Sequence, residues 1–158
     1  MASFFDLLFQ HHPEWKTLPL VPRSGNGWQG RALQVPPPDK ADLTHPLLIE
    51  EVGNEITIDL DHAHIHLSWP PEPWRPDDPF IFIDAILSEE IVAVSGWING
   101  QPRVGSLCAL NKAMKSLILP GLQKVRIRSW KGTHDSDEEA RDAPSLHQAP
   151  ARHPTRDK

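Results

Sequence analysis

Strict alternation of apolar and polar residues begins at Glu55 and makes residues 54–69 the most informative stretch of the chain. Ile56, Ile58 and Leu60 fall on one side of a pleated strand, because successive side chains of a strand point to opposite faces. The alternation then changes phase, so a straight strand would place three histidines on the side of the isoleucines. We therefore expect a bulge or a turn near residues 61–63, which keeps one apolar face against one core.

Cap and turn residues predict the other elements. Ser3 is expected to cap a helix that reaches about residue 10, and Pro79 to begin a helix that runs to about residue 90 after a cap at residue 77 or 78. Asn99-Gly100 predicts a hairpin between strands at residues 91–98 and 103–110. Further strands are expected at residues 31–35, 47–52 and 124–130, and a short helix at residues 111–119.

Two proline-containing stretches predict irregular structure. Residues 13–30 are expected to form a loop, with Trp15 and Trp28 tucked down as anchors. Residues 70–76 contain four prolines, which fix φ and remove backbone donors, so this loop is expected to be stiff and to present Trp74. The adjacent histidines His11 and His12, before Pro13, are expected to be exposed and chemically inert.

The chain is long enough for one domain with a sizeable core. The order of the expected elements predicts an α+β fold over residues 1–134, with a mainly antiparallel sheet and helices packed on one face. From residue 135 the sequence is almost entirely polar and would bury too little apolar surface to offset the entropy of ordering. Residues 135–158 are therefore expected to be a disordered tail.

Charge is divided unevenly along the chain. The formal charge is −10 over residues 1–90, +6 over residues 91–130 and −1 over residues 131–158. An acidic front of this size would repel nucleic acid and attract a basic partner. The alternative is that the two halves neutralise each other within one domain.

Other features indicate a cytoplasmic setting. Cys108 is the single cysteine, so an internal disulfide framework is excluded. The first residues do not resemble a secretory signal, and no apolar run approaches the roughly 18 residues needed to span a bilayer. We expect a cytoplasmic protein with no membrane partner.

His62, His64 and His66 are the first candidates for chemistry. Alternate residues of a strand project to one side, close enough for two neighbouring imidazoles to share a zinc ion. Asp59 or Asp61 would accept a hydrogen bond from the other ring nitrogen and so fix the tautomer of a ligand. Three histidines in a row on a strand rarely converge, however, because the outer two lie too far apart. The alternative is that they fill polar gaps on a half-exposed sheet face, and this interpretation is favoured.

Other catalytic and nucleic-acid sites have less support. Cys108 lies on an expected strand with no helix N-terminus to lower its pKa, which indicates a buried, inert thiol. No glycine-rich phosphate loop or nucleophile elbow is present. Lys124, Arg126 and Arg128, with Trp130, would suit nucleic acid, but one basic strand in an acidic protein is more often a solvated face.

Residues 55–67, Glu-Ile-Thr-Ile-Asp-Leu-Asp-His-Ala-His-Ile-His-Leu, resemble a segment of the bacterial immunity proteins of polymorphic and contact-dependent toxin systems. In that family a strand of the form Glu-Ile-Thr-Val-x-Phe-Asp leads into a His-x-x-His or His-x-His segment. The later order is similar too: a helix ending in Glu-Glu, a strand at residues 91–97, an Asn-Gly turn, and a strand that ends at Trp130. The resemblance covers about residues 45–134. Leu60 and Ala63 depart from it, since aromatic residues are common at these positions.

The resemblance implies a protein without catalytic activity or cofactor that binds a cognate toxin domain, a nuclease or a deaminase, and blocks its active site or substrate groove. The strand at residues 47–52 and the strand from residue 55 are expected to form a hairpin with an acidic surface. This surface agrees with the resemblance, since charge complementarity speeds association and selects the partner, and tryptophans are good interface anchors. The expected partner-binding residues are Glu50, Glu51, Glu55, Asp59, Asp61, His62, His64, His66, Trp69 and Trp74. For the tryptophans core packing is the alternative. For the whole protein the alternative is a small metal-dependent hydrolase built on the three histidines, and no direct contact with nucleic acid is expected.

Overall fold

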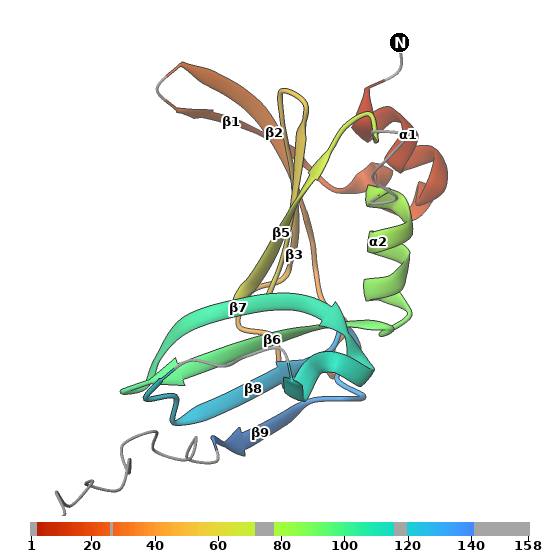
Figure 1. Ribbon diagram of the computed structural model, residues 1–158. Helices are drawn as coiled ribbons and strands as arrows, with labels where there is room; N and C mark the ends of the chain where they lie inside the picture. Colours follow the sequence, from red (N-terminus) through yellow and green to blue (C-terminus); the bar gives the residue numbers. More distant parts are fainter. Residues whose placement is uncertain (1–2, 26, 72–77, 116–119, 141–158) are drawn as a thin grey trace, which may run out of the picture.

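The computed structural model describes residues 3–25, 27–71, 78–115 and 120–140, whose strands form two antiparallel sheets (Figure 1). The first sheet has the order β1-β2-β3-β4-β5, with β1 at Leu20–Gly25, β2 at Trp28–Val35, β3 at Leu47–Val52, β4 at Glu55–Leu60 and β5 at Ala63–Ser68. The second has the order β7-β6-β8-β9, with β6 at Ile91–Ile98, β7 at Gln101–Ala109, β8 at Lys124–Arg128 and β9 at Ser136–Glu139. The helices are α1 (Phe4–His11) and α2 (Pro79–Leu87), with 3-10 turns η1 (Pro13–Thr17) and η2 (Leu110–Lys115). The α+β class with mainly antiparallel strands is confirmed, but the strands are divided between two sheets.

The stretch at residues 54–69 folds as a tight hairpin of β4 and β5. Asp61 turns the chain with a positive φ of 52°. The register pairs Ile58 with Ile65 and Leu60 with Ala63, so the apolar residues of both strands lie on one face despite the change of phase. The expected turn near residues 61–63 is therefore confirmed.

The expected loop at residues 13–30 is wrong. Its second half belongs to the hairpin of β1 and β2, with Leu20 paired to Leu33 and Gly25 to Trp28. β1 is an edge strand, where a proline such as Pro22 is tolerated because one side of the strand needs no partner. Trp15 is buried as expected, but Trp28 is 43% exposed, with its ring beside Gly25 of β1, so the expectation that it tucks into the core is wrong.

One hydrophobic core joins the first sheet to both α-helices, which lie beside that sheet in Figure 1. Phe4, Phe5 and Leu8 of α1 and Ile83 and Ile86 of α2 are fully or almost fully buried in it. They meet the inward residues of the first sheet, among them Leu33, Ile49, Ile56 and Ile58. The caps follow the sequence: Ser3 and Asp6 form a capping box at the start of α1, and Asp78 accepts from the backbone N–H of Phe80 before Pro79 begins α2. Among the residues described, no helix is both long and apolar enough to cross a membrane.

The second sheet includes residues that were expected to belong to the disordered tail. The hairpin at Asn99-Gly100 is confirmed, but Ser136–Glu139 forms β9 and pairs with β8, so the ordered chain continues past residue 134. Charge explains this polar strand. Arg128 is 4% exposed, and its guanidinium lies 2.9 Å from the Asp137 carboxylate and 3.0 Å from that of Asp42. Residues 141–158 of the expected tail lie outside the described residues.

Glu89 ties the end of α2 to the turn after β8. It has a positive φ of 64°, is 7% exposed, and its Oε1 accepts from the backbone N–H groups of Lys131 (2.8 Å) and Thr133 (3.2 Å). Together these contacts hold the second sheet against the helical side of the molecule.

The two sheets meet at an angle where β5 lies next to β7 (Figure 1). Gly105 of β7 makes this possible, because a Cβ at that position would overlap the carbonyl oxygen of His62 in the β4–β5 turn. Ion pairs cross the same junction, as Arg126 lies 3.7 Å from the buried carboxylate of Asp61. The acidic and basic parts of the chain thus neutralise each other in part, which was the alternative interpretation of the charge division.

Candidate functional site

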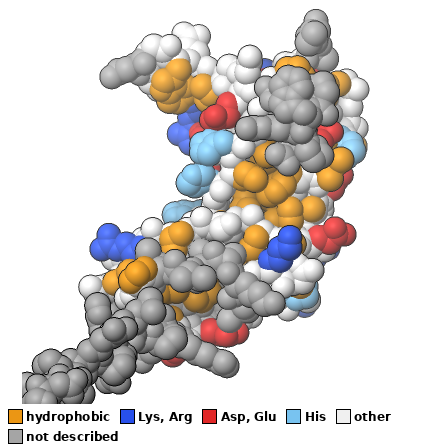
Figure 2. Space-filling model, viewed as in Figure 1, with side chains coloured by type: hydrophobic (Ala, Val, Ile, Leu, Met, Phe, Trp, Pro, Cys, Tyr) orange, Lys and Arg blue, Asp and Glu red, His pale blue; other side chains and the backbone are white. Residues whose placement is uncertain are grey.

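The candidate site is the face of the first sheet opposite to its apolar face, which we call the outer face. Its residues follow from the register, which pairs Thr57 with His66, Asp59 with His64, and Glu50 with Thr57. His64 and His66 are exposed, and their rings meet edge to face with centroids 5.1 Å apart. Figure 2 shows the surface hollowed between the two sheets, with histidine side chains gathered on the wall of the hollow.

His66 is oriented by two neighbours on β4. Its Nδ1 lies 2.9 Å from Oε1 of Glu55 and 3.1 Å from the hydroxyl of Thr57. The second ring nitrogen is therefore the atom that this histidine offers to a partner. Because both His66 and Glu55 are about half exposed, their attraction is screened by water, and the pair positions the ring more than it stabilises the fold.

Asp59 lies deeper in the same face, directly opposite His64. Burial raises the pKa of Asp59, and the neighbouring His64 partly offsets this increase. A half-buried carboxylate beside an exposed imidazole can exchange a proton or a hydrogen bond with a ligand that reaches into the hollow.

His62 occupies the turn between β4 and β5 and faces the second sheet. Its ring packs edge to face on those of His45 and Trp97, with centroids 5.0 and 5.1 Å away. Burial lowers the pKa of His62, against the opposing effect of the Asp61 carboxylate, so this ring is neutral at pH 7. Its Nε2 is buried and has no hydrogen-bond partner among the described residues.

A shallow pocket of about 270 Å³ joins His62 and His64 to the β7 hairpin. The hairpin contributes Pro102, Arg103, Val104 and Gly105 to its lining. These four residues were not among the expected site residues. Nothing local indicates them, because they lie some forty residues further along the chain and reach the site only through the junction of the two sheets.

Two of the expected partner-binding carboxylates have structural roles. Glu51 lies on the apolar side of β3, where it forms an ion pair with Arg31 and accepts from the backbone N–H of Phe4 (3.3 Å). Asp61 is 5% exposed and accepts from the backbone N–H of Thr44 at 2.7 Å. These oxygens satisfy internal donors, and the expected role of the two carboxylates in partner binding stays a prediction.

The other expected residues divide between the outer face and the core. Glu50 lies on the outer face and is paired with Arg23 at 3.1 Å. Trp69 packs edge to face on Phe4 and Phe80, with centroids 5.1 and 5.3 Å away, which favours core packing over an interface role. Trp74 lies outside the described residues. The structure thus brings together Glu50, Glu55, Asp59, His62, His64 and His66.

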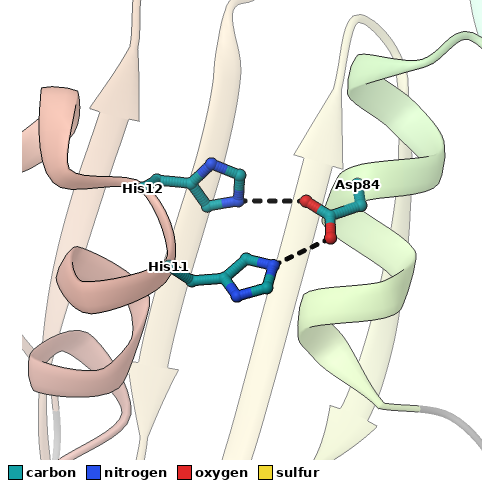
Figure 3. A group of neighbouring side chains, drawn as sticks. All are labelled: His11, His12 and Asp84. Atoms are coloured by element: carbon teal, nitrogen blue, oxygen red, sulfur yellow. Dashed lines mark hydrogen bonds and ion pairs between the residues drawn. The ribbon is translucent and has the colours of Figure 1, made fainter.

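The three histidines of the hairpin do not converge. Within the described ranges, the group of three His, Cys, Asp or Glu residues whose ligand atoms all lie within 4.8 Å of one another is His11, His12 and Asp84 (Figure 3). The expectation that His11 and His12 are exposed and inert is wrong for His12, which is 8% exposed and stacks on Trp15 with centroids 4.2 Å apart.

Comparison with protein-family models, with curated proteins and with solved structures found no match.

Proposed function

We propose that this protein binds and neutralises a cognate bacterial toxin, as the immunity proteins it resembles do, and that the outer face of the first sheet is its binding surface. In this proposal α1 and α2 cover one face of that sheet and leave the other for the partner. The toxin is a nuclease or a deaminase with a basic active-site groove, and the protein acts in the cytoplasm without catalysis of its own.

The observation that carries the proposal is the polar, accessible character of the outer face along β4 and β5, next to the exposed apolar side chains of Val21 and Trp28 on β1 and β2. Glu50, Glu55 and Asp59 project from it together with one arginine, Arg23, that pairs with Glu50. A carboxylate-rich face attracts a basic groove and speeds its association, while the imidazoles of His64 and His66 add hydrogen bonds of defined direction. Such a surface fits recognition by charge and hydrogen bonding better than chemistry on a small substrate.

The hollow between the two sheets provides shape complementarity in addition to charge complementarity. Its two walls are the outer face and the β7 hairpin, and the pocket at their junction has room for a single protruding side chain of the partner. The imidazoles of His62 and His64 and the guanidinium of Arg103 line this pocket, and they offer hydrogen bonds to a polar side chain of the partner. Interfaces commonly depend on one such anchor in a pocket.

The hydrolase alternative has weaker support. A zinc enzyme of this kind needs ligand atoms that meet at one point, whereas His62 lies in the turn and His64 and His66 project from β5 towards solvent. The ligand atoms that do meet belong to His11, His12 and Asp84, on the helical side of the molecule.

The proposal is tested with the toxin domain encoded beside this gene, since immunity genes normally adjoin toxin genes. Co-production should abolish toxicity, and the purified proteins should form a stoichiometric complex. The double variant Glu55→Lys, Asp59→Lys should slow association by about tenfold or more and reduce its salt dependence.

The matched control is Glu138→Lys, Glu139→Lys on β9, which changes the net charge equally at the edge of the second sheet remote from the hollow. It should leave the association rate nearly unchanged. If both double variants slow association equally, the outer face is not the binding surface. If the protein encoded by the neighbouring gene does not bind, the proposed function is refuted.

A further inference from the structure

We propose that His11, His12 and Asp84 form a binding site for a divalent transition-metal ion, with zinc as its best fit, that clamps the end of α1 to α2. This site lies on the helical side of the molecule and is independent of the toxin-binding surface. It rests on the geometry of three side chains from two helices.

The helix end aims both imidazoles at one carboxylate (Figure 3). His11 is the last residue of α1, and His12 leaves helical geometry with φ −121° and ψ 75°. Two adjacent residues of a continuous helix would diverge by about 100°. Here the termination of the helix lets both rings approach Asp84, with His11 Nε2 at 2.9 Å from Oδ2 and His12 Nε2 at 3.1 Å from Oδ1.

His12 carries the strongest indication of a missing partner. The residue is 8% exposed, yet among the described residues its Nε2 has no hydrogen bond, because the nearby Asp84 oxygen lies at a suitable distance but outside hydrogen-bonding geometry. A buried ring nitrogen without a hydrogen bond is unfavourable. A cation held jointly by this nitrogen, by His11 and by Asp84 would satisfy all three groups.

The surroundings of His12 resemble the outer shell of a metal site. Trp15 stacks on the ring and fixes its plane, while Oε1 of Glu14 lies 3.4 Å from Nδ1. A carboxylate at the far nitrogen selects the tautomer that leaves the Nε2 lone pair directed at the metal, and raises the basicity of the ligand.

The donor set and distances suit zinc. Two imidazole nitrogens and one carboxylate oxygen are favoured by zinc and its transition-metal neighbours over magnesium or calcium, which prefer oxygen alone. Zinc bonds of about 2.0–2.2 Å place ligand atoms roughly 3–4 Å apart, and both nitrogen–oxygen distances are already close to this range. His11 and Asp84 are each about half exposed, so water can occupy a fourth position.

The experiment titrates ZnCl₂ into untagged, chelator-treated protein at pH 7.5 by calorimetry, with the absorption spectrum of bound Co²⁺ as a second readout. Wild type should bind one equivalent, with a rise in melting temperature. Asp84→Asn and His11→Ala should each weaken binding by more than about tenfold, the effect seen even for changes in an outer shell. The matched control His64→Ala removes an exposed imidazole from the outer face and should bind as wild type does.

Three outcomes would overturn the proposal: wild type binds no saturable equivalent, a ligand variant binds as tightly as wild type, or His64→Ala loses the metal. If circular dichroism shows that Asp84→Asn does not fold, the zinc affinity of His11→Ala alone tests the site, because His11 is half exposed and its replacement should leave the fold intact. Toxin neutralisation is measured on the same variants. Because the two sites are separate, loss of zinc by the ligand variants supports this site whether or not the protein neutralises a toxin.

Discussion

Glu89→Gln should weaken the fold at neutral pH and flatten its dependence on pH. Burial alone would raise the pKa of Glu89, but hydrogen bonds from the Thr133 and Ser129 side chains and from the backbone N–H groups of Lys131 and Thr133 outweigh it and lower the pKa from 4.5 to about 2. A carboxyl group with a lower pKa in the folded state stabilises the fold at pH values above its unfolded-state pKa.

The magnitude follows from this difference in pKa. At 1.36 kcal/mol per unit, a change from 4.5 to about 2 corresponds to about 3 kcal/mol of unfolding free energy at pH 7. This stabilisation is complete above about pH 5 and is lost as the pH falls through about 2. Glutamine keeps an acceptor oxygen but lacks the charge. The deficit of Glu89→Gln relative to wild type should therefore shrink to about 1 kcal/mol at pH 3.

Urea unfolding followed by tryptophan fluorescence at pH 7, 5 and 3 measures the deficit. Glu90→Gln is the matched control, because Glu90 is the next residue along the chain and is exposed. Its stability should follow wild type at every pH. A deficit of Glu89→Gln that stays constant between pH 7 and pH 3 would refute the reasoning, since the charge of Glu89 would then have no part in its contribution.

Three further predictions concern the junction, the end of the fold and the proposed metal site. Gly105→Ala should destabilise the protein by more than about 2 kcal/mol in urea unfolding, because its Cβ would overlap the His62 carbonyl, whereas Ser106→Ala should have little effect. A chain ending at residue 134 should be at least about 3 kcal/mol less stable than one ending at residue 140, because it loses β9 and leaves the buried Arg128 without Asp137; equal stability would show that β9 adds nothing. Glu14→Gln should weaken zinc binding about tenfold without abolishing it, and unchanged affinity would remove Glu14 from the outer shell.

Elements set by neighbouring residues could be predicted from the sequence. The Ser3 cap, the start of α2 at Pro79, the turn at Asn99-Gly100 and the strands β3, β4 and β6 all have local signatures. β1 and β9 lack them. Pro22 and the acidic residues of β9 contradict strand propensity, and each strand forms because a partner lies beside it: β2 for the first, and the basic strand β8 for the second.

The candidate site could be predicted only in part, and for a related reason. Glu50 and Glu51 are adjacent residues of a strand, so one faces solvent and the other the helices, but the run from Leu47 to Val52 has no alternation that says which. The answer depends on Arg31 and on the backbone of Phe4, both distant in sequence. His12 shows the same limit, because its burial depends on Trp15 and on α2.

The close contact between Gly105 and the His62 carbonyl has a consequence for the proposed binding of a toxin. Because position 105 has no Cβ, β7 lies closer to the β4–β5 turn than a larger residue would allow, and this contact fixes the opening of the hollow in the free protein. A recognition surface built in advance loses little conformational entropy on binding. In the proposed complex, selectivity then depends on excluding proteins whose surfaces do not fit the hollow. The width of the opening is a property of the fold, and a substitution at position 105, where the sheets meet, would change it.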